Sequence, residues 1–268
     1  MVLNKYQKGL TGYFVVLLVF WLILNFSIET TDGFYNYLFS FAFSLVPFVV
    51  GFFSLFLSKS WGGIKSSVGR SVFFLSLGSF CWGLGSMIWS YFNFFLSVSA
   101  PYPSIADLGF LLGSVFWSAG ILSLTRATGA RSGLRRAHGR VLLLLIPITI
   151  TVLSYYLLVY VARGGVLSDS FEASLKLFFD LAYPLSDVVI LTIALVIFSL
   201  SINYLGGKFK PTILILLLGF AVMYLADFTF SYTTTVGTFY NGGFGDLLFA
   251  TALFLISYGT LGFNIQKE

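Results

Sequence analysis

The sequence has 268 residues, of which 58% are hydrophobic and only 9% are charged. Soluble domains carry about 25% charged residues, so a water-soluble fold could not cover this much apolar surface. The chain has a single cysteine, Cys81, and a single histidine, His138. An internal disulfide is therefore excluded, and neither a His-based metal site nor a Ser-His-Asp triad is expected.

Eight apolar segments follow one another along the chain. A hydrocarbon core of about 30 Å needs roughly 20 apolar helical residues. The segments cover residues 10–28, 35–57, 71–95, 105–124, 141–161, 181–200, 212–233 and 245–262. Because backbone amides must be paired in lipid, we expect an all-α integral membrane protein with about eight transmembrane helices, the first of them a retained span and not a signal peptide.

The basic residues predict the orientation of these spans. If the spans alternate, every Lys and Arg except Arg163 and Lys176 falls on one side of the membrane. The positive-inside rule then places both termini in the cytoplasm, with the chain in the cell membrane. The basic balance follows from this topology and does not indicate nucleic-acid binding. The loop between Arg126 and Arg140 is the most basic stretch; it is either a topogenic loop or a dock for anionic lipids or a signalling partner.

Between the fifth and sixth spans, residues 168–180 have apolar side chains at helical spacing, including Phe171, Leu175 and Phe178. We expect a short amphipathic helix here, on the outer surface of the membrane.

Four aspartates lie within or at the mouth of spans: Asp107, Asp187, Asp227 and Asp246. Charged groups there are costly and are candidates for function by default. Three of them start inward-running spans and Asp227 comes late in an outward-running one, so all four fall in the outer half. This distribution predicts an outward-facing ligand pocket above an apolar floor. We expect the four aspartates to line it together with Trp82 and Tyr183, which lie near the same level.

Each of these residues also has a structural interpretation. Ser104 and Asp107 form a capping-box pattern, Asp246 follows a glycine-rich turn as an N-cap would, and Asp187 falls in an expected first helical turn. Asp227 has no capping position. The aromatic residues near this level also fit an interfacial belt, although Trp82 lies deeper than such a belt.

The chain is expected to form one membrane domain, residues 1–268. Two initial spans, in residues 10–57, precede three hairpins over residues 71–124, 141–200 and 212–262. Each returning helix opens with an aspartate followed by an apolar run, which indicates an internal repeat.

Several segments resemble a known membrane module. They are PYPSIAD at residues 101–107, DLAYPLSD at 180–187, and Asp227 followed by GTFYNGGFGD at 237–246. They are similar to the multi-pass input domain found ahead of diguanylate cyclases, phosphodiesterases and some histidine kinases. The resemblance spans residues 70–262 and implies a non-enzymatic sensory role with the four aspartates as motif acids. No output domain follows, so we expect a stand-alone copy that acts through a separate partner.

Other functions stay open at this level. Gly243-Phe-Gly-Asp246 matches the G-x-G-D motif of intramembrane aspartyl proteases, with Asp227 as the second acid, because two carboxylates sharing a proton can activate water. Repeated hairpins with intramembrane acids also suit a transporter or channel for a small solute or cation. A structural subunit of a larger complex or a homodimer is compatible with the sequence, and the sequence does not identify a cofactor.

The topology gives a direct prediction. Reporter tags at Lys267 and in the loop between Arg126 and Arg140 should both be cytoplasmic, and a tag beside Pro101 should be outside. A cytoplasmic signal from the Pro101 position would contradict the eight-span arrangement.

Overall fold

The computed structural model describes residues 4–28, 31, 33–96, 100–127, 137–161, 163–165, 171–201 and 210–264. In this part of the chain the secondary structure is entirely helical. The elements are α1 (Lys5–Ser27), α2 (Phe34–Leu57), η1 (Ser58–Trp61), η2 (Gly63–Lys65), α3 (Ser67–Phe95), α4 (Ala106–Ala127), α6 (Ala137–Tyr155), the π-helical η3 (Tyr156–Val161), α7 (Phe171–Ser201), α8 (Lys210–Val236) and α9 (Phe244–Leu261).

Seven of the described helical segments are long and apolar enough to cross a membrane. They are α1, α2 with η1, α3, α4, the stretch Leu144–Val161 of α6 and η3, α8 and α9. The described residues of α7 add a shorter apolar stretch, Leu185–Leu195. The chain is therefore a multi-pass helical membrane protein, in agreement with the class predicted from its composition.

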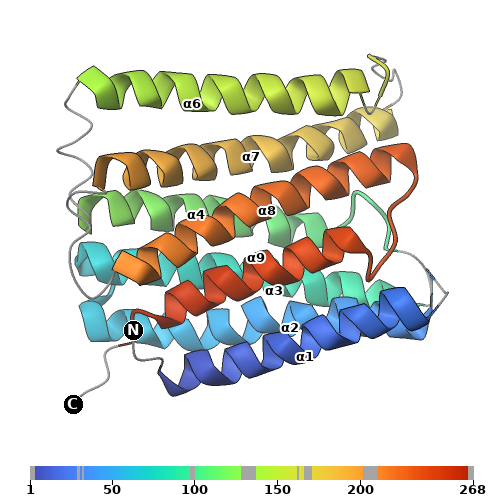
Figure 1. Ribbon diagram of the computed structural model, residues 1–268, viewed down its shortest axis with the longest axis horizontal. Helices are drawn as coiled ribbons and strands as arrows, with labels where there is room; N and C mark the ends of the chain where they lie inside the picture. Colours follow the sequence, from blue (N-terminus) through green and yellow to red (C-terminus); the bar gives the residue numbers. More distant parts are fainter. Residues whose placement is uncertain are drawn as a thin grey trace.

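The long helices lie side by side in one bundle, and both chain ends are at the same end of it (Figure 1). Helix α3 packs between α2 and α4, and α8 packs between α7 and α9. Helix α9 also contacts α1, α2 and α3, which joins the two halves, and α6 packs on α7 at the edge. Consecutive helices are thus neighbours with one exception, because α7 lies between α4 and α6.

Small residues let α3 and α4 approach closely. A Cβ atom placed on Gly109 of α4 would lie 2.7 Å from the Cα atom of Gly85 in α3, and one on Gly78 would lie 2.8 Å from the carbonyl oxygen of Gly113. No side chain fits at these distances without moving a backbone. Gly109 and Gly113 of α4 therefore lie against the glycines of α3.

Helix α7 differs from the expectation. Residues 168–180 were expected to form a separate surface helix, and 181–200 a span with Asp187 in its first turn. The structure instead has one continuous helix of 31 residues, Phe171–Ser201, about 46 Å long at 1.5 Å per residue. The helical spacing of Leu175, Phe178 and Ala182 runs across the expected boundary, so the pattern holds no stop signal there. Asp187 consequently lies in the middle of α7, where the first-turn interpretation fails.

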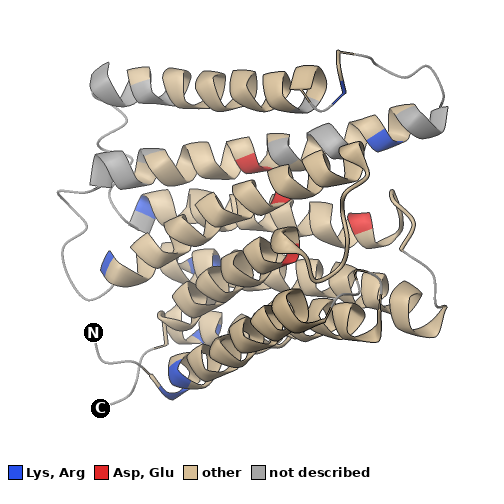
Figure 2. Ribbon diagram, turned by 45° about the vertical axis from the view of Figure 1, so that its right-hand side comes forward, with Lys and Arg blue, Asp and Glu red and all other residues tan. Residues whose placement is uncertain are grey.

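Charge is divided between the two ends of the bundle. Figure 2 shows most of the described Lys and Arg residues toward the end that holds both termini, and the coloured acidic residues away from that end. The acids whose side chains the structure describes are Asp107, Asp187, Asp227 and Asp246. This separation matches the distribution read from the sequence and places the acids in one region of the bundle.

The glycine contact predicts a difference in stability. Gly109→Ala should destabilise the protein by about 1–3 kcal/mol, because the added methyl group must push α3 and α4 apart. Gly12→Ala in α1 is the control, since a Cβ there meets nothing within 4 Å. Thermal unfolding in detergent, followed by far-UV circular dichroism, measures the difference. Equal midpoints for the two variants would contradict close packing at Gly109.

Candidate functional site

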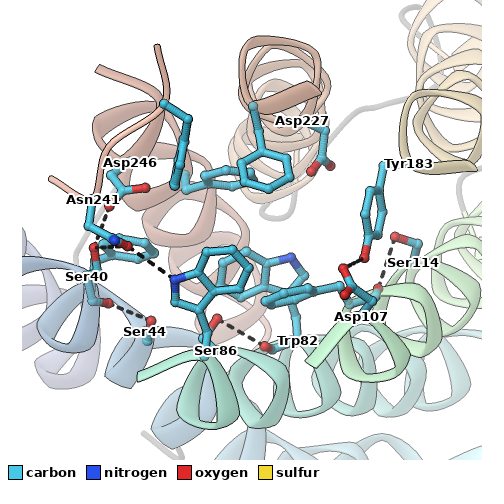
Figure 3. Close-up of a pocket in the computed structure, with 16 residues that line it drawn as sticks. Ser40, Ser44, Trp82, Ser86, Asp107, Ser114, Tyr183, Asp227, Asn241 and Asp246 are labelled. Carbon is cyan, nitrogen blue, oxygen red and sulfur yellow. Dashed lines mark hydrogen bonds between the residues drawn. The ribbon is translucent and has the colours of Figure 1, made fainter. Parts of the chain in front are cut away.

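A cavity of about 60 Å³ lies where α2, α3, α4, α7, α8 and α9 converge (Figure 3). One water molecule needs roughly 10–15 Å³ of such space, so the cavity has room for a few waters or one small solute. Its polar lining consists of Ser40, Ser44, Trp82, Ser86, Trp89, Asp107, Ser114, Tyr183, Asp227, Asn241 and Asp246. Phe43, Phe110, Phe230, Phe239 and Phe249 complete the wall. Five of the six residues expected at the site therefore line one cavity.

Asp246 is held at the start of α9. The N-cap of this helix is Gly243, so the expectation that Asp246 is the N-cap is wrong. Asp246 instead lies in the first turn and reaches back, where its carboxylate accepts hydrogen bonds from the Gly242 N–H at 2.7 Å and from the Ser40 hydroxyl. Gly242 has a φ of 78°, a left-handed conformation that favours glycine. The turn therefore aims a backbone donor at the carboxylate.

A polar network extends from this carboxylate to α2 and α3. The side-chain oxygen of Asn241 accepts a hydrogen bond from the Trp89 indole at 3.2 Å, and Asn36 donates to the Asn241 carbonyl oxygen at 2.9 Å. Sequence reasoning missed the contribution of α2. A signal for it exists, because Asn36, Ser40 and Ser44 recur every four residues and therefore share one face of an otherwise apolar helix.

Asp107 has both a capping role and a tertiary contact. Its carboxylate accepts a hydrogen bond from the Ser104 N–H, while the Ser104 hydroxyl accepts one from the Ala106 N–H. The predicted capping interaction is thus confirmed. The other carboxylate oxygen accepts a hydrogen bond from the Tyr183 hydroxyl, which ties α4 to α7. Both side chains are nearly completely buried. Capping and cavity lining are therefore compatible at this residue.

Asp227 and Asp187 form a carboxyl pair. Their side chains are within hydrogen-bonding contact across the α7–α8 interface, with Asp227 at the cavity wall and Asp187 behind it. Asp187 is 2% exposed, and its Oδ2 atom has no hydrogen-bond partner among the described residues. Two carboxylates in contact require a shared proton or a nearby cation. The G-x-G-D interpretation required Asp227 to pair with Asp246; the structure pairs it with Asp187.

Aromatic rings form much of the cavity wall. The Trp82 indole packs against Phe110, Phe249 and Phe43, with ring centroids 5.0, 5.6 and 6.5 Å apart. Its N–H makes no hydrogen bond within the described residues and faces the cavity (Figure 3). Trp82 lies inside the bundle and not in an interfacial belt. Acidic and aromatic groups thus share one small space.

The carboxyl groups of the cavity have no basic neighbour among its described lining residues. None of the described Lys or Arg side chains lines it. The described residues also contain no group of three or more His, Cys, Asp or Glu side chains arranged to hold a metal ion. Carboxylates surrounded by aromatic faces attract cations through charge and through the ring quadrupoles. The site is consequently suited to a small positively charged group.

The cavity is closed toward the end of the bundle that holds the termini. In this direction the next turns of α4, α8 and α9 carry buried apolar side chains, and α3 reaches its apolar residue below Ser79, whose hydroxyl accepts a hydrogen bond from the Trp117 indole. These are Leu75 in α3, Trp117 and Ile121 in α4, Leu216, Phe220 and Met223 in α8, and Leu253 and Ile256 in α9. The Trp117 and Phe220 rings meet at 5.6 Å. A packed apolar layer therefore forms the floor of the cavity.

Comparisons of the chain with protein-family models, with curated proteins and with solved structures find no match. The resemblance to membrane input domains stays a prediction that rests on the motifs themselves.

The contrast between the carboxyl pair and the capped carboxylate predicts opposite effects of the same substitution. Asp107→Asn should destabilise the protein by about 1–3 kcal/mol, because its amide nitrogen would face one of two hydrogen-bond donors. Asp187→Asn should keep or raise the stability, because its amide can donate to Asp227 and the like-charge contact disappears. Thermal unfolding in detergent distinguishes them. A larger loss for Asp187→Asn than for Asp107→Asn would refute the assigned contacts.

Proposed function

We propose that the protein is a non-enzymatic membrane sensory module whose buried acidic cavity binds a small cationic ligand. The observation that carries the proposal is the cavity itself, in which Asp107, Asp227 and Asp246 face aromatic rings without a described Lys or Arg beside them. A binding protein needs no more than this complementarity. The motif resemblance to sensory input domains supports the same function independently of the geometry.

The size and chemistry of the cavity favour an ammonium-type ligand. Pockets for drug-sized molecules have volumes of roughly 300–1,000 Å³, far above the 60 Å³ found here. A methylated or unsubstituted ammonium group can donate hydrogen bonds to the carboxylates and contact the faces of Trp82 and Trp89. The cavity wall supplies acceptors and aromatic surface in the same space, which is the combination such a cation requires.

The apolar floor favours sensing over transport. A transporter alternates between openings on the two sides of the membrane. Here Trp117, Phe220 and Met223 are essentially fully buried below the cavity. A ligand held above this layer can change the packing of α4, α8 and α9 without passing through it. This favours a receptor-like function.

The orientation of the module completes the proposal. We place the chain in the cell membrane with eight spans, the cavity toward the outside and both termini in the cytoplasm. A separate signalling partner would then meet the basic cytoplasmic face, including the loop between Arg126 and Arg140. Residues 128–136 of that loop lie outside the described part of the chain. The concentration of described basic residues at the terminus-bearing end supports this orientation.

Tryptophan fluorescence tests ligand binding, since two of the five tryptophans line the cavity. Methylammonium should change the emission of the purified protein saturably, whereas neutral methanol at equal concentration should not. Asp227→Asn should weaken methylammonium binding about tenfold or more, because a hydrogen bond between two charged groups is lost. An equal response to both compounds, or an unchanged affinity in Asp227→Asn, would argue against the cationic ligand.

The same protein reconstituted in liposomes separates sensing from transport. Radiolabelled methylammonium should not accumulate inside the vesicles faster than in protein-free controls. Saturable uptake that Asp227→Asn abolishes would replace the sensory proposal with transport.

A further inference from the structure

A second hollow lies at the other end of the bundle, between the first turns of α1 and the last turns of α2. It is a groove of about 840 Å³, bounded also by Leu261 and Asn264 near the C-terminal end of α9. It shares no residue with the acidic cavity. From its lining we propose that this groove binds an acyl chain of one anionic phospholipid, whose phosphate contacts Lys5.

The groove exists because α1 touches the bundle along a narrow line. Its buried apolar residues are Leu10, Leu17 and Leu24, spaced seven residues apart. On the neighbouring face Gly9 provides no side chain, and a Cβ atom built there meets nothing within 4 Å. The Tyr13 hydroxyl donates a hydrogen bond to the Ala42 carbonyl oxygen at 2.7 Å, which joins α1 to α2 at the deep end. Between Tyr13 and the start of α1 the two helices stand apart.

The wall of the groove is apolar along most of its length. On α2 it consists of Leu45, Val46, Val49, Val50, Phe53 and Leu57. The one polar side chain of α2 in the wall is Ser54, which is 2% exposed and whose hydroxyl has no hydrogen-bond partner within the described residues. A buried hydroxyl normally finds an acceptor. The ester oxygens of a lipid supply acceptors at the junction between its chains and its headgroup.

The polar end of the groove is basic. Lys5 belongs to the lining, and its ammonium group lies 5.0 Å from the centroid of the adjacent Tyr6 ring. Lys59 lies two residues beyond the last residue of α2, at the same end of the bundle. An apolar slot with a cation at its mouth is complementary to an acyl chain that ends in a phosphate. Because the helices on both sides of the groove cross the bilayer, the acyl chains of lipids surround its opening.

This inference is independent of the proposed sensory function, because it concerns different residues at the opposite end of the bundle. Native mass spectrometry of the full chain tests it, with phosphatidylglycerol and phosphatidylcholine of identical acyl chains added to the delipidated protein. We expect the native protein to retain one phosphatidylglycerol several-fold more than one phosphatidylcholine.

Two matched pairs of variants locate that lipid. Gly9→Leu should fill the groove and abolish the retained lipid, whereas Gly12→Leu should retain it; Gly12 also lies in open space but does not line the groove. Lys5→Gln should remove the preference for phosphatidylglycerol. Lys8→Gln is its control and should preserve the preference, because Lys8 is exposed and does not line the groove. Leucine favours helix more than glycine, so Gly9→Leu should not unfold α1.

Three results would overturn the proposal. In the first, the native protein retains the two lipids equally. In the second, the Gly9→Leu variant retains as much phosphatidylglycerol as the native protein. In the third, the native protein is a dimer and the Gly9→Leu variant is a monomer. The last would identify a second copy of the chain as the occupant.

Discussion

A carboxylate buried among apolar helices costs several kcal/mol unless hydrogen-bond donors, water or a cation surround it. Four such side chains lie in one region of this bundle, and several of its buried polar groups donate hydrogen bonds to them. Asp246 receives a backbone donor from a glycine turn and a hydroxyl from α2. Asp107 receives a cap donor and the hydroxyl of Tyr183. Each of these two acids thus connects its own helix to another part of the chain.

The Asp187–Asp227 pair differs from the other two, because carboxyl groups in contact offer each other no donor unless a proton is shared. The structure supplies the pair with neighbouring cavity space and leaves Asp187 Oδ2 without a partner in the described part of the chain. This arrangement is what a cation-responsive site needs, since a positive charge arriving in the cavity relieves the repulsion. In the function that we propose, the pair would connect ligand binding to the packing of α7 against α8.

The two hollows of the bundle reflect two kinds of helix packing. Around the acidic cavity, α3 and α4 approach through glycine contacts and the floor is filled by Trp117, Phe220 and Met223. Tight packing below a small polar space keeps that space separate from the other side of the membrane. Helix α1 packs more loosely, through residues on a single line, and leaves an apolar groove open to lipid. One hollow is therefore small and lined by carboxyl groups, and the other is larger and mostly apolar.

The amino-acid pattern was sufficient to predict a helical membrane protein. Hydrophobic runs of bilayer length and the need to pair backbone amides in lipid allow few other structures. It also located Asp107, Asp227, Asp246, Trp82 and Tyr183 near a common level, and the Ser104–Asp107 spacing was sufficient for the capping interaction. These properties depend on local spacing along the chain, which a sequence records directly.

Contacts between distant segments required the folded bundle. The choice of Asp187 over Asp246 as the neighbour of Asp227 depends on which helices pack together and on their rotation about their axes, and neither is written in local spacing. The role of Ser40 and Asn241 was hidden for the same reason, since serine and asparagine in an apolar span have many uses. The continuity of α7 was missed because interfacial and spanning helices share one backbone geometry. Tertiary packing, through the burial of each helix face, decided these features.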